Sequence, residues 1–390
     1  MKHLSFTLSA LLLGALLPGG SFAQQKLTVD KDYDPNGFPK AIPVFLTGYS
    51  GEVDTVLKND LLMMGVDAVS EEKATHILSG KSDGIQVEGS LMDKFNKNYL
   101  LRQAFKGGNS RAQAHALADA VAVALNRGPG IAQTKVAFKA QKGQVREIFI
   151  ADYDGRGAIQ VTQDNTISAA PCWAGRGALY YTSYKLGNPD IYYHNLATGD
   201  RRPVARYLGL NTSAAVSRDG QHLAMILSKG GNPDLYVSDL NGANVRRLTS
   251  TAGEESSPCW SPDGREICYV SKESGANRLY RISASGGSAR AIPTTGTPNC
   301  TEPDWSPDGK WIAFTSQTRS FQICIVPSTG GDAIVLAEGE DPTWAPNSRA
   351  ILFVRRQNNT RVLSLLDAPS KRVKDVARVW ESTSQPSWSR

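Results

Sequence analysis

The sequence predicts a small α/β N-terminal domain followed by an all-β six-bladed β-propeller that is closed by pairing of the chain ends. Three observations indicate this fold. A pattern recurs about every 44 residues through the last two thirds of the chain, no such pattern precedes residue 130, and the repeated region begins and ends with an incomplete unit. We therefore expect a leader at 1–23, the α/β domain at 24–130 and the propeller at 131–390.

The first 23 residues have the features of a secretory signal peptide. Lys2 and His3 precede an apolar run from Leu8 to Leu17, and Ser21-Phe22-Ala23 is a small-x-small cleavage pattern. The apolar run is too short to cross a bilayer as a helix. We expect cleavage after Ala23 and an exported, soluble protein with no lipid anchor, because no cysteine stands at the cleavage site.

The charge balance excludes little and favours no nucleic-acid partner. Without the single lysine of the leader, 42 basic and 37 acidic residues remain. Such a mild excess does not create the concentrated basic surface that nucleic acid requires.

Residues 24–130 alternate between strand-like and helix-like patterns. We expect strands at 41–48, 75–80 and 84–93, and helices at 52–65 and 110–126. Ser110 is the expected cap of the second helix. Gly80–Gly84 matches the G-x-S-x-G pattern of hydrolases, but a strand-like segment follows it instead of a helix, so we interpret it as a hairpin turn.

The repeat is defined by two markers that share one period. A tryptophan or its substitute steps by 43, 44, 45, 39 and 44 residues, at Trp173, Val216, Trp260, Trp305, Trp344 and Trp388. An aliphatic residue in a second segment keeps the same phase, at Ile148, Ile191, Leu235, Leu279, Ile323 and Val362.

Each repeat unit predicts four strands. A Pro-x-Trp segment leads into a tight Ser-Pro-Asp-Gly turn, an apolar strand, an alternating strand of the "DLYVSD" type and a short last strand. Four strands in about 44 residues make one propeller blade. The first unit starts at Lys135 without a Pro-x-Trp segment, so we expect Gln385–Trp388 to supply its inner strand and close the ring.

Catalytic chemistry is poorly represented. The four histidines of the mature chain have no metal-ligand spacing, the five cysteines form no C-x-x-C pair, and no nucleotide-binding motif occurs. We expect no enzyme activity, no metal and no cofactor. Cys259 and Cys268 flank a hairpin and are expected to face each other across two strands, and the sequence leaves open whether they form a disulfide.

The loops that precede the innermost strands are acidic. The eight residues before each tryptophan slot contain no Lys or Arg in 48 positions, and they contain eight acidic residues: Glu254, Glu255, Glu302, Asp304, Glu338, Glu340, Asp341 and Glu381. Strand direction places these loops together at one mouth of the central channel. One interpretation of this acidic composition is that the loops are simply polar and solvated. The other is a negative ring that attracts a basic or donor-rich partner, with basic residues such as Lys139 at its rim.

The order of these parts resembles the TolB family of the Tol–Pal envelope system. The resemblance rests on "KLTVDKDY", "HALADAV", "TKVAFKA", "IADYDG", the "PxWSPDGxxIAF" repeats and the terminal "PSWS". It implies a non-enzymatic periplasmic monomer that reaches membranes only through its partners. Those partners would be the lipoprotein Pal, at the channel mouth, and TolA, at the extreme N-terminus.

The resemblance also implies partner-binding residues. For Pal they are Asn211, Thr212, Glu254, Glu255, Ser256, Thr301, Glu302 and Asp341, and for the N-terminal segment they are Lys26, Leu27, Thr28, Val29 and Asp30. The alternative function is a secreted propeller that binds or cleaves a small glycan or peptide in its channel.

Overall fold

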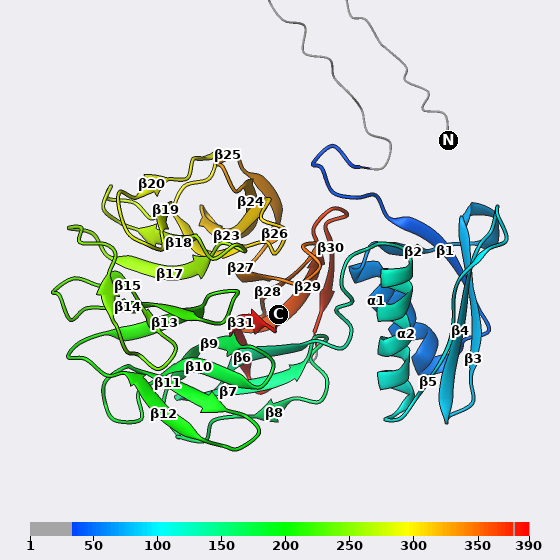
Figure 1. Ribbon diagram of the computed structural model, residues 1–390, viewed down its shortest axis with the longest axis horizontal. Coiled ribbons are helices and arrows are strands. Elements are labelled where there is room, and N and C mark those ends of the chain that lie inside the picture. Colours follow the sequence, from blue (N-terminus) through cyan, green and yellow to red (C-terminus); the bar gives the residue numbers. More distant parts are fainter. Residues whose placement is uncertain (1–32, 377–378, 390) are drawn as a thin grey trace, which may run out of the picture.

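The computed structural model describes residues 33–376 and 379–389, so the leader and the segment Lys26–Asp30 lie outside the described residues. Two bodies stand side by side, a ring of blades and a smaller α/β unit (Figure 1). Both bodies of the predicted fold are confirmed, in the predicted order along the chain.

The α/β unit is one five-stranded sheet with two helices on one face. The strand order is β2-β1-β3-β4-β5, and the helices lie between the sheet and the propeller (Figure 1). The elements are β1 (Ile42–Thr47), α1 (Gly51–Met63), β2 (Val66–Ala68), the short helix η1 (Glu71–Lys73), β3 (His76–Ser82), β4 (Gln86–Asp93), β5 (Tyr99–Lys106) and α2 (Ser110–Ala124). The stripe predicted for α1 is buried, at Val53, Val56, Leu57 and Leu61.

Three details of this unit differ from the sequence-based expectation. The cap of α2 is Asn109, whose side chain accepts a 2.9 Å hydrogen bond from the Ala112 amide; Ser110 is already the first helical residue. The edge strand β5 was not expected, because its side chains are mostly exposed and show no apolar alternation. The turn predicted at Gly80–Gly84 is shorter and lies further along the chain: Gly80 to Ser82 still pair with β4 as the end of β3, and residues 83–85 make the turn.

Six four-stranded sheets form the ring, and each is numbered here as a blade from the innermost strand outwards. Blade 1 consists of β31 (Ser382–Trp388), β6 (Lys135–Lys142), β7 (Val145–Asp152) and β8 (Ile159–Gln160). Blade 2 consists of β9 (Ser168–Ala174), β10 (Ala178–Ser183), β11 (Asp190–Asn195) and β12 (Arg201–Ala205). Blade 3 consists of β13 (Asn211–Val216), β14 (His222–Leu227), β15 (Asp234–Asp239) and β16 (Arg246–Arg247).

Blade 4 consists of β17 (Glu255–Trp260), β18 (Glu266–Ser271), β19 (Arg278–Ser283) and β20 (Arg290–Ala291). Blade 5 consists of β22 (Cys300–Trp305), β23 (Trp311–Gln317), β24 (Phe321–Pro327) and β26 (Ile334–Glu338). Blade 6 consists of β27 (Glu340–Trp344), β28 (Ala350–Gln357), β29 (Thr360–Asp367) and β30 (Arg372–Asp375). A small pair, β21 (Thr294–Thr295) and β25 (Gly331–Asp332), links the outer parts of blades 4 and 5.

The chain ends close the ring as predicted. The last strand, β31, pairs antiparallel with β6, with Trp388 opposite Val136, and lies beside β9 of the next blade (Figure 1). The Lys135 amide also donates to the Ser389 hydroxyl at 2.9 Å. Closure gives blade 1 its inner strand and removes two unpaired sheet edges from the ring.

The repeated tryptophans pack between neighbouring blades. Trp305 is 4% exposed and lies in a cluster with Cys268 and Val270 of the preceding blade. Two indole groups also cross to the preceding blade by hydrogen bonds, from Trp173 to the Ser387 carbonyl at 3.0 Å and from Trp260 to the Ala215 carbonyl at 2.9 Å. The tryptophans therefore hold one blade to the next, which is why the sequence repeats them.

The two bodies share a buried polar contact. The Asp60 carboxylate of α1 accepts hydrogen bonds from His115 Nδ1 of α2, at 2.6 Å, and from the Tyr153 hydroxyl of blade 1. All three side chains are at least 95% buried. Because both partners of Asp60 come from other elements, this carboxylate ties α1, α2 and the propeller together.

Candidate functional site in the central channel

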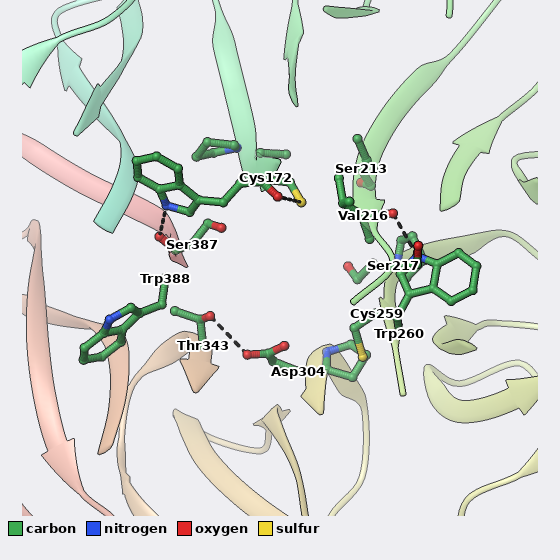
Figure 2. A pocket seen from close by; sticks show the side chains of 18 of the residues that line it. Cys172, Ser213, Val216, Ser217, Cys259, Trp260, Asp304, Thr343, Ser387 and Trp388 are labelled. Carbon is green, nitrogen blue, oxygen red and sulfur yellow. Dashed lines mark hydrogen bonds between the residues drawn. The ribbon is translucent and has the colours of Figure 1, made fainter. Parts of the chain in front are cut away.

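The innermost strands of the six blades surround a cavity of about 570 Å³. Side chains from several blades lie around one central space, among them Cys172, Ser213, Cys259, Asp304 and Thr343 (Figure 2). The lining includes Ser217 and Ser261, which begin turns of the Ser-Pro-Asp-Gly type, and none of the loops that precede the innermost strands. The cavity therefore occupies the turn side of the channel.

One residue in each blade adopts a left-handed backbone conformation where the channel is lined. These residues are three positions before the tryptophan slot, have φ between 49° and 56°, and form what we call the waist ring: Ala170, Ser213, Ser257, Glu302, Asp341 and Gln385. None is glycine, the residue for which this conformation has little cost. The same strain in all six blades indicates that the fold imposes it.

A β-bulge at the same position in each blade explains the strain. Pairing between the two inner strands slips by one residue there, for example between Thr301 and Asp304, so that Glu302 and Pro303 oppose the single residue Phe314. The five other innermost strands slip at the equivalent place. Proline follows the waist residue in five blades, and it suits a bulge because it needs no amide partner.

Half of the waist ring is joined by hydrogen bonds that run from blade to blade. Glu302 Oε2 accepts from the Asp341 amide at 2.9 Å, and Asp341 Oδ2 accepts from the Gln385 amide at 2.9 Å. Gln385 Oε1 in turn accepts from the Ala170 amide at 3.0 Å. In each case a waist side chain binds the waist amide of the following blade.

The two waist carboxyls hold protons more tightly than ordinary carboxyls. Burial, and then the neighbouring charge of Asp341, raises the pKa of Glu302 to about 8. Burial also raises the pKa of Asp341. Lys139, which the sequence analysis placed at the rim of the mouth, instead interacts electrostatically with Asp341. Burial lowers the pKa of the Lys139 ammonium group. Both shifts favour the protonated form of these carboxyls.

The residues proposed for partner binding divide into buried and accessible groups. Asn211 is fully buried and donates to the Pro189 carbonyl at 3.0 Å, and Glu255 is 2% exposed and accepts from Thr251 and Ser271. Glu254 is exposed. A further group is partly exposed: Thr212, Ser256, Thr301, Glu302 and Asp341.

The acidic loops are less free than their composition indicates. Glu340 pairs with Arg356 at 3.2 Å and with Arg361 at 2.6 Å, and these arginines lower its pKa against the effect of burial. Asp304 accepts from the Trp344 amide at 2.7 Å. Several of the eight acidic residues thus stabilise the blades. The accessible negative charge at the mouth is therefore smaller than eight carboxylates would give.

Sequence reasoning missed most of the waist ring. It singled out Glu302 and Asp341, and it passed over Ala170, Ser213, Ser257 and Gln385. The only feature of the sequence that could have identified these four residues is their shared position, three residues before each tryptophan slot. Cys259 and Cys268 do face each other across β17 and β18, and no disulfide joins them.

The described residues contain no group of three or more His, Cys, Asp or Glu side chains placed to hold a metal ion. Neither α1 nor α2, the two α-helices among residues 33–376 and 379–389, has the length and apolarity needed to span a bilayer.

Comparison with known proteins identifies relatives of the repeated region. Residues 124–390 match the family model described as the TolB beta propeller domain. A Tol-Pal system protein TolB of Alcanivorax borkumensis is 30% identical over 156 residues, and one of Francisella tularensis subsp. mediasiatica is 33% identical over 156 residues. These alignments cover 38% and 37% of this chain and 36% of either relative, so they span little more than a third of the curated relatives' length.

Solved structures extend the similarity to both bodies. A crystal structure of TolB from Acinetobacter baumannii matches with a TM-score of 0.79 at 22% identity, over 90% of this chain and 97% of that chain. A chain of a nidogen/laminin complex matches with a TM-score of 0.55 at 12% identity, over 66% of this chain and 98% of that chain. The first match covers more of this chain than the ring contains, so it extends into the α/β unit, whereas the second covers two thirds of the chain.

Proposed function

The chain belongs to the TolB β-propeller family, and from this premise we propose that it is a non-enzymatic periplasmic adaptor of the Tol–Pal system. It binds the lipoprotein Pal at the channel mouth and TolA through Lys26–Asp30, and in this way supports outer-membrane integrity and cell division. Export by a leader cleaved after Ala23 delivers it to the periplasm.

One observation carries the Pal assignment. The innermost strands β17 and β22 are neighbours in the ring, and their starts bring Glu254, Ser256 and Thr301 together where solvent reaches them. A partner segment that docks there meets one exposed carboxylate and two hydroxyl groups. Glu255 lies between Glu254 and Ser256 in the chain and is buried, and its hydrogen bonds with Thr251 and Ser271 help to fix this segment. Asn211 is buried at the start of β13 in blade 3 and does not belong to this surface.

The cavity lining supports binding in preference to catalysis. Among the described residues that line it there is no histidine, lysine or tyrosine, and the carboxyls of Glu302 and Asp341 bind backbone amides of the ring. Hydrolytic chemistry usually requires a nucleophile with a base in hydrogen-bond reach. The geometry suits recognition of a polypeptide.

Calorimetric titration with the soluble domain of Pal tests the proposal. Glu254→Lys should weaken binding about tenfold, mainly through slower association, and added salt should reduce the effect. Arg265→Glu is the matched control, because Arg265 is exposed beside a turn at the opposite end of its blade. A protein whose Pal binding is absent, or is lost only in the Arg265 variant, contradicts the assignment.

The TolA assignment is tested separately. Deleting residues 26–30 should abolish capture of TolA and leave Pal affinity unchanged. Loss of both interactions, or of neither, would remove the N-terminal segment from the proposal.

The size of the cavity favours one second candidate. A volume of about 570 Å³ falls in the range of small-ligand sites, so a glycan or peptide fragment in the channel is the alternative function. Soluble peptidoglycan fragments that bind in the absence of Pal and shift the NMR signals of cavity residues would favour it.

A further inference from the structure

Three of the six waist residues donate their backbone N–H group to a side-chain oxygen of the preceding blade. The other three occupy equivalent positions, yet no side chain of the described residues accepts a hydrogen bond from their N–H groups. The served amides are those of Asp341, Gln385 and Ala170. The remaining three belong to Ser213, Ser257 and Glu302, which have φ values of 56°, 50° and 54°. Since all six residues share one bulge and one backbone conformation, their N–H groups point in equivalent directions.

The residue types explain why only half of the waist residues are joined by these hydrogen bonds. Each served amide is bound by the waist residue of the preceding blade, which is glutamate, aspartate or glutamine. Ala170 precedes Ser213 and has no acceptor atom. Ser213 precedes Ser257, and Ser257 precedes Glu302, and a serine side chain is two bonds shorter than glutamine.

The residues that carry these amides line the cavity. Ser213, Ser257 and Glu302 all line it, and Ser213 lies at the wall of the central space (Figure 2). An amide N–H that lacks a partner away from bulk water costs free energy comparable to a lost hydrogen bond.

We propose that the amides of Ser213, Ser257 and Glu302 are a docking site for a side-chain amide, that of asparagine or glutamine, carried by a partner segment that enters the channel. Each of the three amides is a separate position, and at whichever one is occupied the incoming carbonyl oxygen takes the place that Gln385 Oε1 takes for Ala170. This inference rests on the proposed function in one respect, namely that the segment belongs to a protein partner.

The neighbouring charges favour a neutral acceptor over a carboxylate. Glu302 and Asp341 already place negative charge on the same ring, and a second anion would be repelled. The hydroxyls of Ser213 and Ser257 add donors or acceptors for the NH₂ group of the ligand. A primary amide meets both requirements.

NMR of the full mature protein with acetamide as probe tests the site without any partner. Acetamide should shift the amide signals of Ser213, Ser257 and Glu302 and leave those of Asp341 and Gln385 in place. In the free protein the first three should exchange with solvent about tenfold faster or more, as expected for amides that lack the side-chain acceptor of the other three. Equal exchange, or equal shifts at all six residues, would overturn the proposal.

Two reciprocal variants sharpen the test. Ala170→Gln supplies the missing acceptor, so it should abolish the acetamide response of Ser213 and preserve that of Ser257. Ala170→Leu fills similar volume without an acceptor and should preserve both responses. Gln385→Ala removes an existing acceptor and should make the Ala170 amide responsive. If Ala170→Gln does not fold, Gln385→Ala decides, and an unresponsive Ala170 there refutes the site.

The partner experiment separates this inference from the proposed function. Ala170→Gln should weaken Pal about tenfold, the factor that one hydrogen bond typically contributes, and Ala170→Leu should weaken it less. Absence of Pal binding in the wild-type protein contradicts the proposed function alone. Wild-type affinity in Ala170→Gln, with Pal bound, contradicts the site alone.

Discussion

Individual side chains in this ring perform two tasks, and the tryptophans illustrate the first. Trp305 is almost completely enclosed between blades 4 and 5, and its indole group donates to the Gly309 carbonyl at 3.3 Å. Truncating a large buried aromatic leaves a cavity that the surrounding strands cannot fill.

Trp305→Ala should therefore lower the free energy of unfolding by about 3–5 kcal/mol. Trp311→Ala is the control, because Trp311 is only partly buried and stacks on Phe38 at the surface of the ring. Denaturant titration of both variants measures the difference. Similar losses in the two variants would contradict the packing role of Trp305.

The waist carboxyls perform the second task, and they make stability depend on pH. The pKa of Glu302 is about 8 in the folded protein against an ordinary value of 4.5. The folded state thus binds this proton more tightly than the unfolded chain. Its contribution is complete below about pH 4.5 and is lost as the pH rises towards 8.

Glu302→Gln should flatten this dependence. Glutamine keeps an oxygen for the Asp341 amide and cannot ionise. Because channel water screens the pair, we expect the wild-type protein to lose about 1–2 kcal/mol between pH 5 and pH 9 relative to the variant. Urea titrations at several pH values measure this loss, with Glu254→Gln as an exposed control. Parallel profiles for wild type and Glu302→Gln would contradict a raised pKa of Glu302 in the folded protein.

At the scale of the element, the sequence was informative wherever structure depends on local patterns. The Ser-Pro-Asp-Gly turns and the buried tryptophans recur because each blade repeats the same turn and the same packing. The edge strand β5 (Tyr99–Lys106) was missed because most of its side chains are exposed, and only Leu101 and Phe105 pack against the core, which is too few to show an alternation.

The candidate site was only partly predictable for a different reason. The conformation of Ala170 or Ser213 depends on a bulge that arises from pairing with another strand, and neither residue type suggests φ > 0. Counting acidic residues also could not distinguish Glu254, which is exposed, from Glu340, which two arginines neutralise.

The closing strand gives a prediction at this scale. Deleting residues 384–390 removes most of β31 and leaves β6 and β9 without their neighbour in the ring. Newly exposed strand edges promote association between chains, so the shortened protein should aggregate or melt at a much lower temperature. Light scattering and thermal melts measure this, with a variant lacking only Arg390 as control. A monomeric deletion variant of unchanged stability would contradict closure.

For the whole molecule, the polar contact at Asp60 determines whether the two bodies unfold together. Tyr153→Phe removes one of the two hydrogen bonds to this buried carboxylate, which should cost about 1–3 kcal/mol. Because Tyr153 belongs to the propeller and Asp60 to α1, the loss should separate the melting of the two bodies in calorimetry.

Tyr49→Phe is the matched control for this contact. Its hydroxyl donates to the Glu88 carbonyl at 2.9 Å, within the α/β unit alone. That variant should lower the stability of the unit without changing its coupling to the ring. The coupling role of Asp60 fails if both variants change the calorimetric profile in the same way.

Ring closure also sets the order in which the molecule can be completed. Lys135 and Ser389 are 254 positions apart and meet in the same blade. A chain made from its N-terminus supplies the inner strand of its first blade last. Every earlier length of chain is an open arc, and contacts of such long sequence separation form slowly. The ring can therefore close only once residues 382–388 have been synthesised, so this one strand controls when folding is completed.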